Sequence, residues 1–211
     1  FIRMKNIIIG TLAHVDAGKT TLSESLLYTC GSIRKIGRVD HKDTFLDFNE
    51  QERGRGITIF SKEANFTYND TNFTLVDTPG HVDFSCEMER ALQVIDYAIV
   101  LISGLDGVQP HSETIWKLLE HYNIPAFVFV NKMDINHKSK DELMLDIKKS
   151  LSSNCVCFND ENFEEEASMA SEETMNYFLE NLCLETSMIQ DAIASRKIFP
   201  VYFGSALKQQ G

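Results

Sequence analysis

The sequence lacks any long apolar stretch. No run in its 211 residues approaches the roughly 18 that a membrane-spanning helix needs, and no signal-peptide pattern opens it. Hydrophobic residues still make up 43% of the chain, which is enough to bury a sizeable core. The length suits one domain, with room for a small insertion. We therefore expect a cytoplasmic protein with no membrane partner.

An excess of positive charge is also missing. Lysine and arginine total 20 against 31 aspartate and glutamate residues, so the net charge is −11. Proteins that bind nucleic acid unaided are usually basic, because contacts with phosphates supply most of their affinity. The chain by itself is therefore expected to bind RNA poorly and to have no DNA partner. Any work on RNA would need other domains or local basic patches.

Cysteines are few and irregularly spaced. The five are Cys30, Cys86, Cys155, Cys157 and Cys183. An odd number without a regular spacing indicates reduced thiols, which again fits the cytoplasm. Cys155 and Cys157 form a C-x-C pair, but no second pair or nearby histidine completes a metal site, so packing is the better interpretation.

Apolar, strand-like segments alternate with helical patterns along most of the chain. We expect strands at 6–10, 58–68, 72–77, 97–102, 125–130 and 198–203, and helices at 19–29, 84–94, 112–122 and 138–151. This alternation predicts an α/β fold of the doubly wound class. Its sheet should be mostly parallel, with about six strands and helices on both faces. Ligands of such sheets bind at the carboxyl ends of the strands.

Two segments depart from that alternation. Residues 30–56 are polar and rich in glycine, and a loop of this length is usually functional or disordered. Residues 153–195 carry an acidic stretch and then a helical pattern near 177–193, which predicts a small inserted subdomain. The acidic run by itself indicates a solvated face more often than a binding site.

Residues 13–20 read AHVDAGKT between the first strand and the first helix. This is the phosphate-loop (P-loop) pattern with alanine in place of the first glycine. Backbone N–H groups at a helix N-terminus point at phosphate, Lys19 reaches the β- and γ-phosphates, and the Thr20 hydroxyl binds Mg²⁺. Asp16 either binds a monovalent cation or stabilises the loop. The predicted nucleotide contacts are His14, Val15, Asp16, Ala17, Gly18, Lys19, Thr20 and Thr21.

Residues 77–81, DTPGH, follow an apolar strand. The Asp77 carboxylate can hold Mg²⁺ through water. The Gly80 N–H can contact the γ-phosphate, and glycine lets the loop move when that phosphate leaves. His81 is either a surface histidine or the group that positions the attacking water. We favour the second role because His81 follows a phosphate-sensing glycine.

Residues 131–134, NKMD, follow the strand expected at 125–130. The Asp134 carboxylate can accept hydrogen bonds from guanine N1–H and N2–H₂, a donor pair that adenine lacks. Asn131 would face guanine N7 and tie this loop to the phosphate loop, while Lys132 packs over the base. Guanine O6 would accept from Ala206 N–H in the segment Ser205, Ala206 and Leu207. These motifs, in this order, predict a GTP-binding domain over residues 1–211.

Residues 4–134 closely resemble translational GTPases of the elongation factor G group. The resemblance rests on the phosphate loop with its leading alanine, on 47–59 (DFNEQERGRGITI), on 107–110 (GVQP) and on the histidine of DTPGH. It implies that Thr58 binds Mg²⁺ and senses the γ-phosphate. It also implies GTP hydrolysis to GDP, with Lys19 and His81 acting in catalysis and ribosomal RNA completing the site.

The spacing between Asn131 and Ser205 is shorter than in elongation factor G and longer than in elongation factor four. With 4–8 (MKNII) and 199–206 (FPVYFGSA), it resembles the tetracycline ribosomal protection proteins. The alternatives are a translocase of the elongation factor G type, a signalling GTPase switch, and a nucleotide-binding module without turnover.

The resemblance also sets the expected partners. They are the ribosome, through its RNA and through a basic stalk protein beside the acidic segment, with the protein itself a monomer. Because the chain stops at Gly211, directly after the predicted guanine loop, we expect further domains beyond it.

Overall fold

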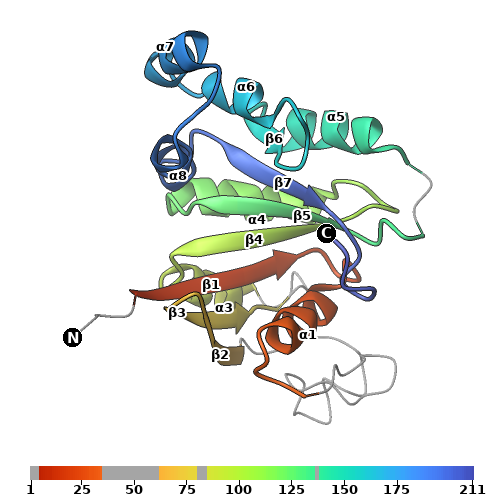
Figure 1. Cartoon of the computed structure of the whole chain (residues 1–211). Coiled ribbons are helices and arrows are strands. Elements are labelled where there is room, and N and C mark those ends of the chain that lie inside the picture. The colour runs from red at the N-terminus through yellow and green to blue at the C-terminus, as the bar shows by residue number, and fades with distance from the viewer. Residues whose placement is uncertain (1–4, 35–61, 80–84, 136–137) are drawn as a thin grey trace.

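The computed structural model describes residues 5–34, 62–79, 85–135 and 138–211, which form a sheet of seven strands with helices around it (Figure 1). The strand order is β2-β3-β1-β4-β5-β7-β6. Strand β2 runs antiparallel to β3, and every other pair is parallel. The strands are β1 (Lys5–Ala13), β2 (Lys62–Tyr68), β3 (Thr71–Asp77), β4 (Tyr97–Ser103), β5 (Ala126–Asn131), β6 (Cys155–Cys157) and β7 (Phe199–Phe203). The doubly wound α/β prediction is confirmed.

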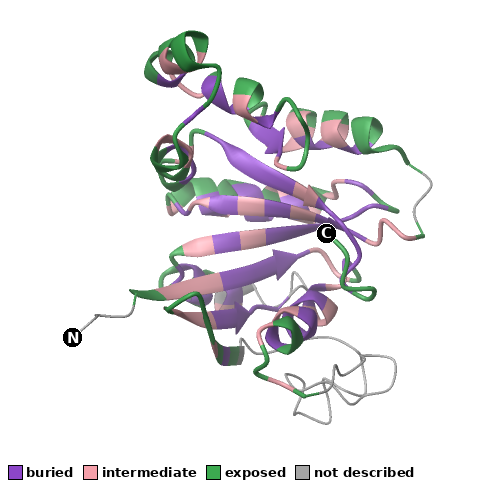
Figure 2. Ribbon diagram, viewed as in Figure 1, coloured by how far each residue is buried: buried purple, intermediate pink, exposed green. Residues whose placement is uncertain are grey.

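The alternation of side chains along β5 shows why both faces of the sheet are covered. Val128 and Val130 lie in the main core with side chains from three helices. These are α3 (Ser85–Leu92), α4 (Pro110–His121) and α5 (Lys140–Ser150). Phe127 and Phe129 point to the opposite face, where Phe129 packs in a cluster with α1 (Lys19–Thr29). Residues of the central strands are therefore mostly buried, while the outer faces of the helices are exposed (Figure 2).

The sheet has one strand more than the sequence patterns indicated. The extra strand is β6, a three-residue segment that pairs in parallel with β7 at the sheet edge. Its residues fall within 153–195, where we expected a small inserted subdomain. The pattern near 177–193 is divided between α7 (Glu172–Asn181) and α8 (Thr186–Ala194), because Leu182 adopts the left-handed conformation (φ 56°) and ends α7. Helix α6 (Phe163–Ser168) precedes them.

Neighbouring parallel strands end at one edge of the sheet. Ala13 of β1 is level with Leu101 of β4, and Ser103 of β4 is level with Asn131 of β5. The loops that follow these strands therefore emerge side by side, which positions the site described below. Within the described residues, no helix is both long and apolar enough to cross a membrane.

Candidate functional site

The phosphate loop connects β1 to α1, which is the position between strand and helix that the sequence predicted. Gly18 takes a left-handed conformation (φ 93°) at the N-terminus of α1, and the Ala17 N–H donates to the His14 carbonyl at 3.2 Å. No side chain caps α1, and its first turn carries no acidic residue. Helices α5 and α7 each have a capping box instead. Helix α1 thus begins without a capping side chain or a negative charge of its own, and its dipole favours an anion at this end.

Asp77 lies at the end of β3, fully buried beside the phosphate loop. Its Oδ1 accepts from the Lys19 ammonium at 2.7 Å, from the Thr11 hydroxyl at 3.0 Å and from the Ser23 hydroxyl at 3.4 Å. Its Oδ2 is also buried but has no hydrogen-bond partner among the described residues. A buried carboxylate oxygen left in this way suits a cation, because burying charge is costly unless it is paired.

Mg²⁺ fits this corner of the site. Lys19 at the start of α1 contacts the Asp77 carboxylate at 2.7 Å, and Thr20, the predicted hydroxyl ligand, is the next residue along the helix. Among the described residues no group of three or more His, Cys, Asp or Glu could form a metal cage. Mg²⁺ does not need one, because it is usually held by one or two protein oxygens, water and substrate phosphates. Thr58, Gly80 and His81 lie outside the described residues, and their roles stay predictions.

The guanine segments meet at Asn131, which is almost fully buried. Its Nδ2 donates to the Ala17 carbonyl at 2.9 Å, and its Oδ1 accepts from the Ala206 N–H at 2.8 Å. One side chain therefore joins the phosphate loop to the loop after β7. The first of these bonds is the link to the phosphate loop that we expected. The second uses the Ala206 N–H, the donor that we predicted for guanine O6, and that contact with the base stays a prediction.

Asp134 lies beside the same loop. A hydrogen bond from the Ser205 hydroxyl is the main cause that lowers the pKa of the Asp134 carboxyl, and contacts with Lys208 lower it further. The Asp134 carboxyl therefore stays ionised to a lower pH than an ordinary aspartate, and the ionised form is the one that accepts from N–H donors. Lys132 takes a left-handed conformation (φ 65°), and Leu207 is exposed at the tip of the loop.

Comparison with known proteins shows which family the chain belongs to. The family model described as the elongation factor Tu GTP binding domain matches residues 4–211. The chain belongs to this family. It is therefore a GTP-binding domain, and the guanine selectivity inferred from residues 131–134 and 205–207 fits that membership.

Named relatives include two kinds of protein. The tetracycline resistance protein TetP of Clostridium perfringens is 47% identical over 154 residues, 72% of this chain and 24% of its own length. TetM of Ureaplasma urealyticum is 38% identical, covering 99% of this chain and 35% of its own length. Elongation factor G of Gluconobacter oxydans is 50% identical over 126 residues, which is 60% of this chain and 18% of its own. The chain thus spans about a third or less of each of these relatives.

Solved structures agree on the fold. A crystal structure of a Thermus thermophilus protein superposes with a TM-score of 0.86 at 21% identity. The match covers 98% of the GTP-binding domain and 38% of that protein.

Sequence motifs missed several polar residues that support the site of the GTP-binding domain. Thr11 and Ser23 hold Asp77, and the Ser25 hydroxyl donates to the Ala206 carbonyl at 2.7 Å. Both serines lie on the buried side of α1. A hydroxyl at the end of an otherwise apolar strand was the available signal for Thr11. For the serines there was none, because only the fold shows which side of α1 faces the loops.

Helix α4 also approaches the phosphate loop. The His14 and His111 rings pack edge to face, with centroids 6.0 Å apart. The loop before α4 is held from α5, where Asp146 Oδ2 accepts from the Val108 N–H at 2.8 Å. The 107–110 segment is thereby fixed between α5 and the nucleotide loops.

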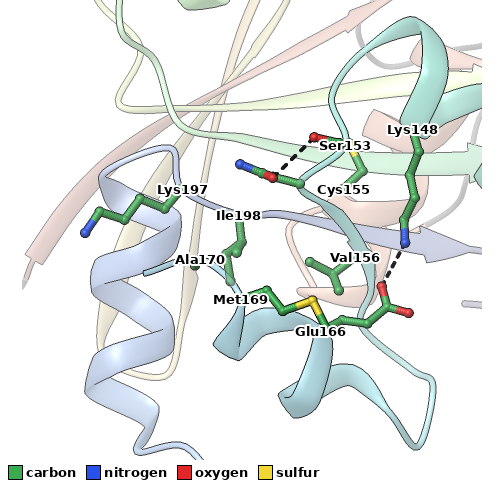
Figure 3. A pocket seen from close by; sticks show the side chains of 10 residues that line it. Lys148, Ser153, Cys155, Val156, Glu166, Met169, Ala170, Lys197 and Ile198 are labelled. Atoms are coloured by element: carbon green, nitrogen blue, oxygen red, sulfur yellow. Dashed lines mark hydrogen bonds and ion pairs between the residues drawn. The ribbon is translucent and has the colours of Figure 1, made fainter. Parts of the chain in front are cut away.

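A separate cavity of about 380 Å³ lies at the β6 edge of the sheet (Figure 3). Its wall includes the Lys148–Glu166 ion pair (2.9 Å) and the apolar side chains of Val156, Met169 and Ile198. None of the residues that line it belongs to the phosphate or guanine loops. The cavity is therefore distinct from the nucleotide site.

Proposed function

We propose that the protein hydrolyses GTP to GDP and phosphate. The observation that carries this proposal is the Asn131 side chain, which joins the phosphate loop to the guanine loop through hydrogen bonds of 2.9 Å and 2.8 Å. Binding a guanine base and a triphosphate together requires these two loops to hold a fixed separation. Phosphoryl transfer then depends mainly on positioning and charge stabilisation rather than on covalent chemistry.

Each residue of the site would contribute to that stabilisation. Lys19 and the N–H groups that open α1 would bind the phosphate oxygens. Thr20, Thr58 and Asp77 would hold Mg²⁺, which supplies positive charge to the β- and γ-phosphates. His81 would position the attacking water, and Gly80 would sense the γ-phosphate. Turnover would be slow until ribosomal RNA completes the site.

Asp16 has two candidate roles in this scheme. It takes a left-handed conformation (φ 64°) and its side chain is exposed. Aspartate tolerates that conformation better than most residues, which supports a role in shaping the loop. A monovalent cation beside Asp16 is the alternative.

We further propose that the intact protein acts on the ribosome in the cytoplasm as a monomeric tetracycline protection factor. TetP and TetM are both tetracycline resistance proteins, and the TetM alignment covers nearly the whole chain. GTP hydrolysis would release such a factor after it has dislodged the bound drug. Translocation of the elongation factor G type is the second candidate, because elongation factor G is 50% identical over 126 residues.

The acidic composition of residues 153–195 favours a protein partner over RNA for this segment. We propose that they form an inserted subdomain, since Val156, Phe163, Ala167 and Leu184 share a core cluster that also includes Ile198 and borders the sheet at Phe127. Two carboxylates of its acidic run already have partners within the protein. Glu166 pairs with Lys148, and Glu164 accepts from the Leu184 N–H at 2.9 Å. The other acidic residues of α6 and α7 would repel ribosomal phosphates within a Debye length of about 8 Å.

An apolar stripe on α7 supports the same choice of partner. Met175 and Leu179 lie four residues apart on α7 and so share a helical face, and they are 41% and 69% exposed, while Leu182, which ends the helix, is 78% exposed. Glu172 and Glu173 stand in the first turn of the same helix. A basic, partly apolar protein such as a component of the ribosomal stalk would complement this surface.

Two measurements test these proposals on the intact protein. Purified ribosomes should accelerate its GTP turnover, and turnover that ribosomes leave unchanged would favour a signalling switch instead. The protein should restore translation in the presence of tetracycline and fail to replace elongation factor G in a purified system. Support of translocation without any effect on drug sensitivity would overturn the protection role and leave the GTPase proposal standing.

A further inference from the structure

Lys208 lies against the carboxylate that is expected to read the guanine base. Its ammonium Nζ is 3.4 Å from Asp134 Oδ2. The Asp134 side chain is only 10% exposed, whereas the Lys208 side chain is 54% exposed. A lysine that is free to move on its solvent side therefore contacts a carboxylate that is largely fixed.

The backbone after β7 explains why Lys208 reaches Asp134. The Lys208 N–H donates both to the Ser205 carbonyl (3.2 Å) and to the Ser205 hydroxyl (3.3 Å), which closes a tight turn. Ser205 and Gln210 then exchange two backbone hydrogen bonds, of 2.7 Å and 3.0 Å. The turn that carries Ala206 into the site therefore also carries the Lys208 side chain over Asp134.

We propose that Lys208 competes with the guanine base for Asp134 and so limits the affinity for guanine nucleotides. This inference rests on the proposed recognition of guanine by Asp134. Guanine presents N1–H and N2–H₂ as a pair of donors, and a carboxylate accepts such a pair with both of its oxygens. Lys208 already contacts one of these oxygens, so the base must displace or weaken that contact.

The energetic balance makes the competition modest and reversible. An ion pair with one partner more than half exposed contributes little, because water and salt screen it. Lysine has a flexible four-carbon stem, so its ammonium can leave Oδ2 without disturbing the turn. The Ser205 hydroxyl lowers the pKa of the Asp134 carboxyl more than Lys208 does, so the displaced lysine leaves behind an ionised acceptor for the base.

The test compares equilibrium GDP binding by calorimetry for the wild-type intact protein and three variants. Lys208→Met removes the ammonium and keeps the length of the side chain, while Lys208→Arg retains the charge. Lys117→Met is the matched control, since it removes one positive charge from an exposed position on α4. Melting temperatures without nucleotide establish that every variant folds.

Lys208→Met should bind GDP about two- to fivefold more tightly than wild type at low salt, the range that an exposed ion pair allows. The gain should shrink between about 20 and 300 mM salt, because screening weakens the ion pair in the wild type. Lys208→Arg and Lys117→Met should resemble the wild type. Unchanged or weaker binding by Lys208→Met would overturn the competition. Failure of the wild type itself to bind GDP would count against the proposed function instead.

Discussion

Asn131 donates its side-chain amide to the backbone carbonyl of Ala17, a residue 114 positions earlier in the chain, at 2.9 Å. The same side chain accepts from Ala206 N–H, 75 positions later. Three loops that leave three different strands are thus held by one buried amide. Their spacing is fixed by the protein itself, and a nucleotide would meet loops that are already arranged.

Asn131→Ala should destabilise the fold as well as weaken nucleotide binding. It would leave the Ala17 carbonyl and the Ala206 N–H without their buried partner, at a cost of about 1–3 kcal/mol each. We expect the melting temperature to fall by roughly 5–15 °C in differential scanning calorimetry. The control is Asn181→Ala, which removes an exposed amide bonded to the Tyr177 carbonyl and should have little effect. Equal melting temperatures for the two variants would show that the Asn131 link is not structural.

Two glycines with positive φ provide a matched pair for the phosphate loop. A Cβ on Gly18 (φ 93°) would lie 2.3 Å from Asn131 Nδ2, whereas a Cβ on Gly31 (φ 75°) would meet nothing within 4 Å. Gly31→Ala should therefore cost only the backbone strain, roughly 1 kcal/mol. Gly18→Ala should displace Asn131 and abolish GTP binding in a filter or calorimetric assay. Retained GTP binding by Gly18→Ala would mean that the phosphate loop and Asn131 can move apart without loss of the site, which would contradict this prediction.

Asp134→Asn should change which nucleotide binds. Loss of the charged acceptor should weaken GTP binding roughly 10- to 100-fold, the range for a hydrogen bond to a charged group. Xanthosine triphosphate should bind better, because its 2-oxo group can accept from the new amide. Competition titrations with both nucleotides decide the matter, and an equal loss for the two would contradict a base-reading role.

Lys19→Ala and His81→Ala should separate binding from hydrolysis. Lys19 is buried against Asp77 at 2.7 Å, so its loss would remove the predicted phosphate ligand and leave a buried carboxylate without its counter-ion. We expect no measurable GTP binding for Lys19→Ala. His81→Ala should keep affinity within about threefold while ribosome-stimulated turnover falls by about 10²-fold or more. Normal turnover by His81→Ala would reduce His81 to a loop residue.

Cysteine reactivity should report the burial of β6. Desolvation raises the pKa of the Cys155 thiol from its ordinary 9.0 to about 12, and Cys183 is exposed. Iodoacetamide at pH 8 should modify Cys183 and spare Cys155 until the protein unfolds, as read by peptide mass spectrometry. Rapid native labelling of Cys155 would show that β6 opens readily.

The folded state holds the Cys155 thiol proton more tightly than the unfolded state does. The free energy of unfolding should therefore fall as the pH rises between 9 and about 12.

The amino-acid order by itself determined the α/β class, the phosphate loop and the guanine motif. These features are local: a strand, a glycine turn and a helix start are encoded by adjacent residues. Helix α1 begins and ends where its pattern predicted, at Lys19 and Thr29. The family resemblance was likewise carried by short contiguous motifs.

The tertiary structure alone decided how those motifs meet. Nothing near Asp134 in the sequence shows that Lys208 would contact it, and the acidic segment did not indicate that β6 would extend the sheet. Polar side chains such as Thr11 and Ser23 acquire their role only where strands and helices far apart in sequence converge on Asp77. The physical reason is that the pairing of buried polar groups depends on distance in space, which the chain sets only when it packs.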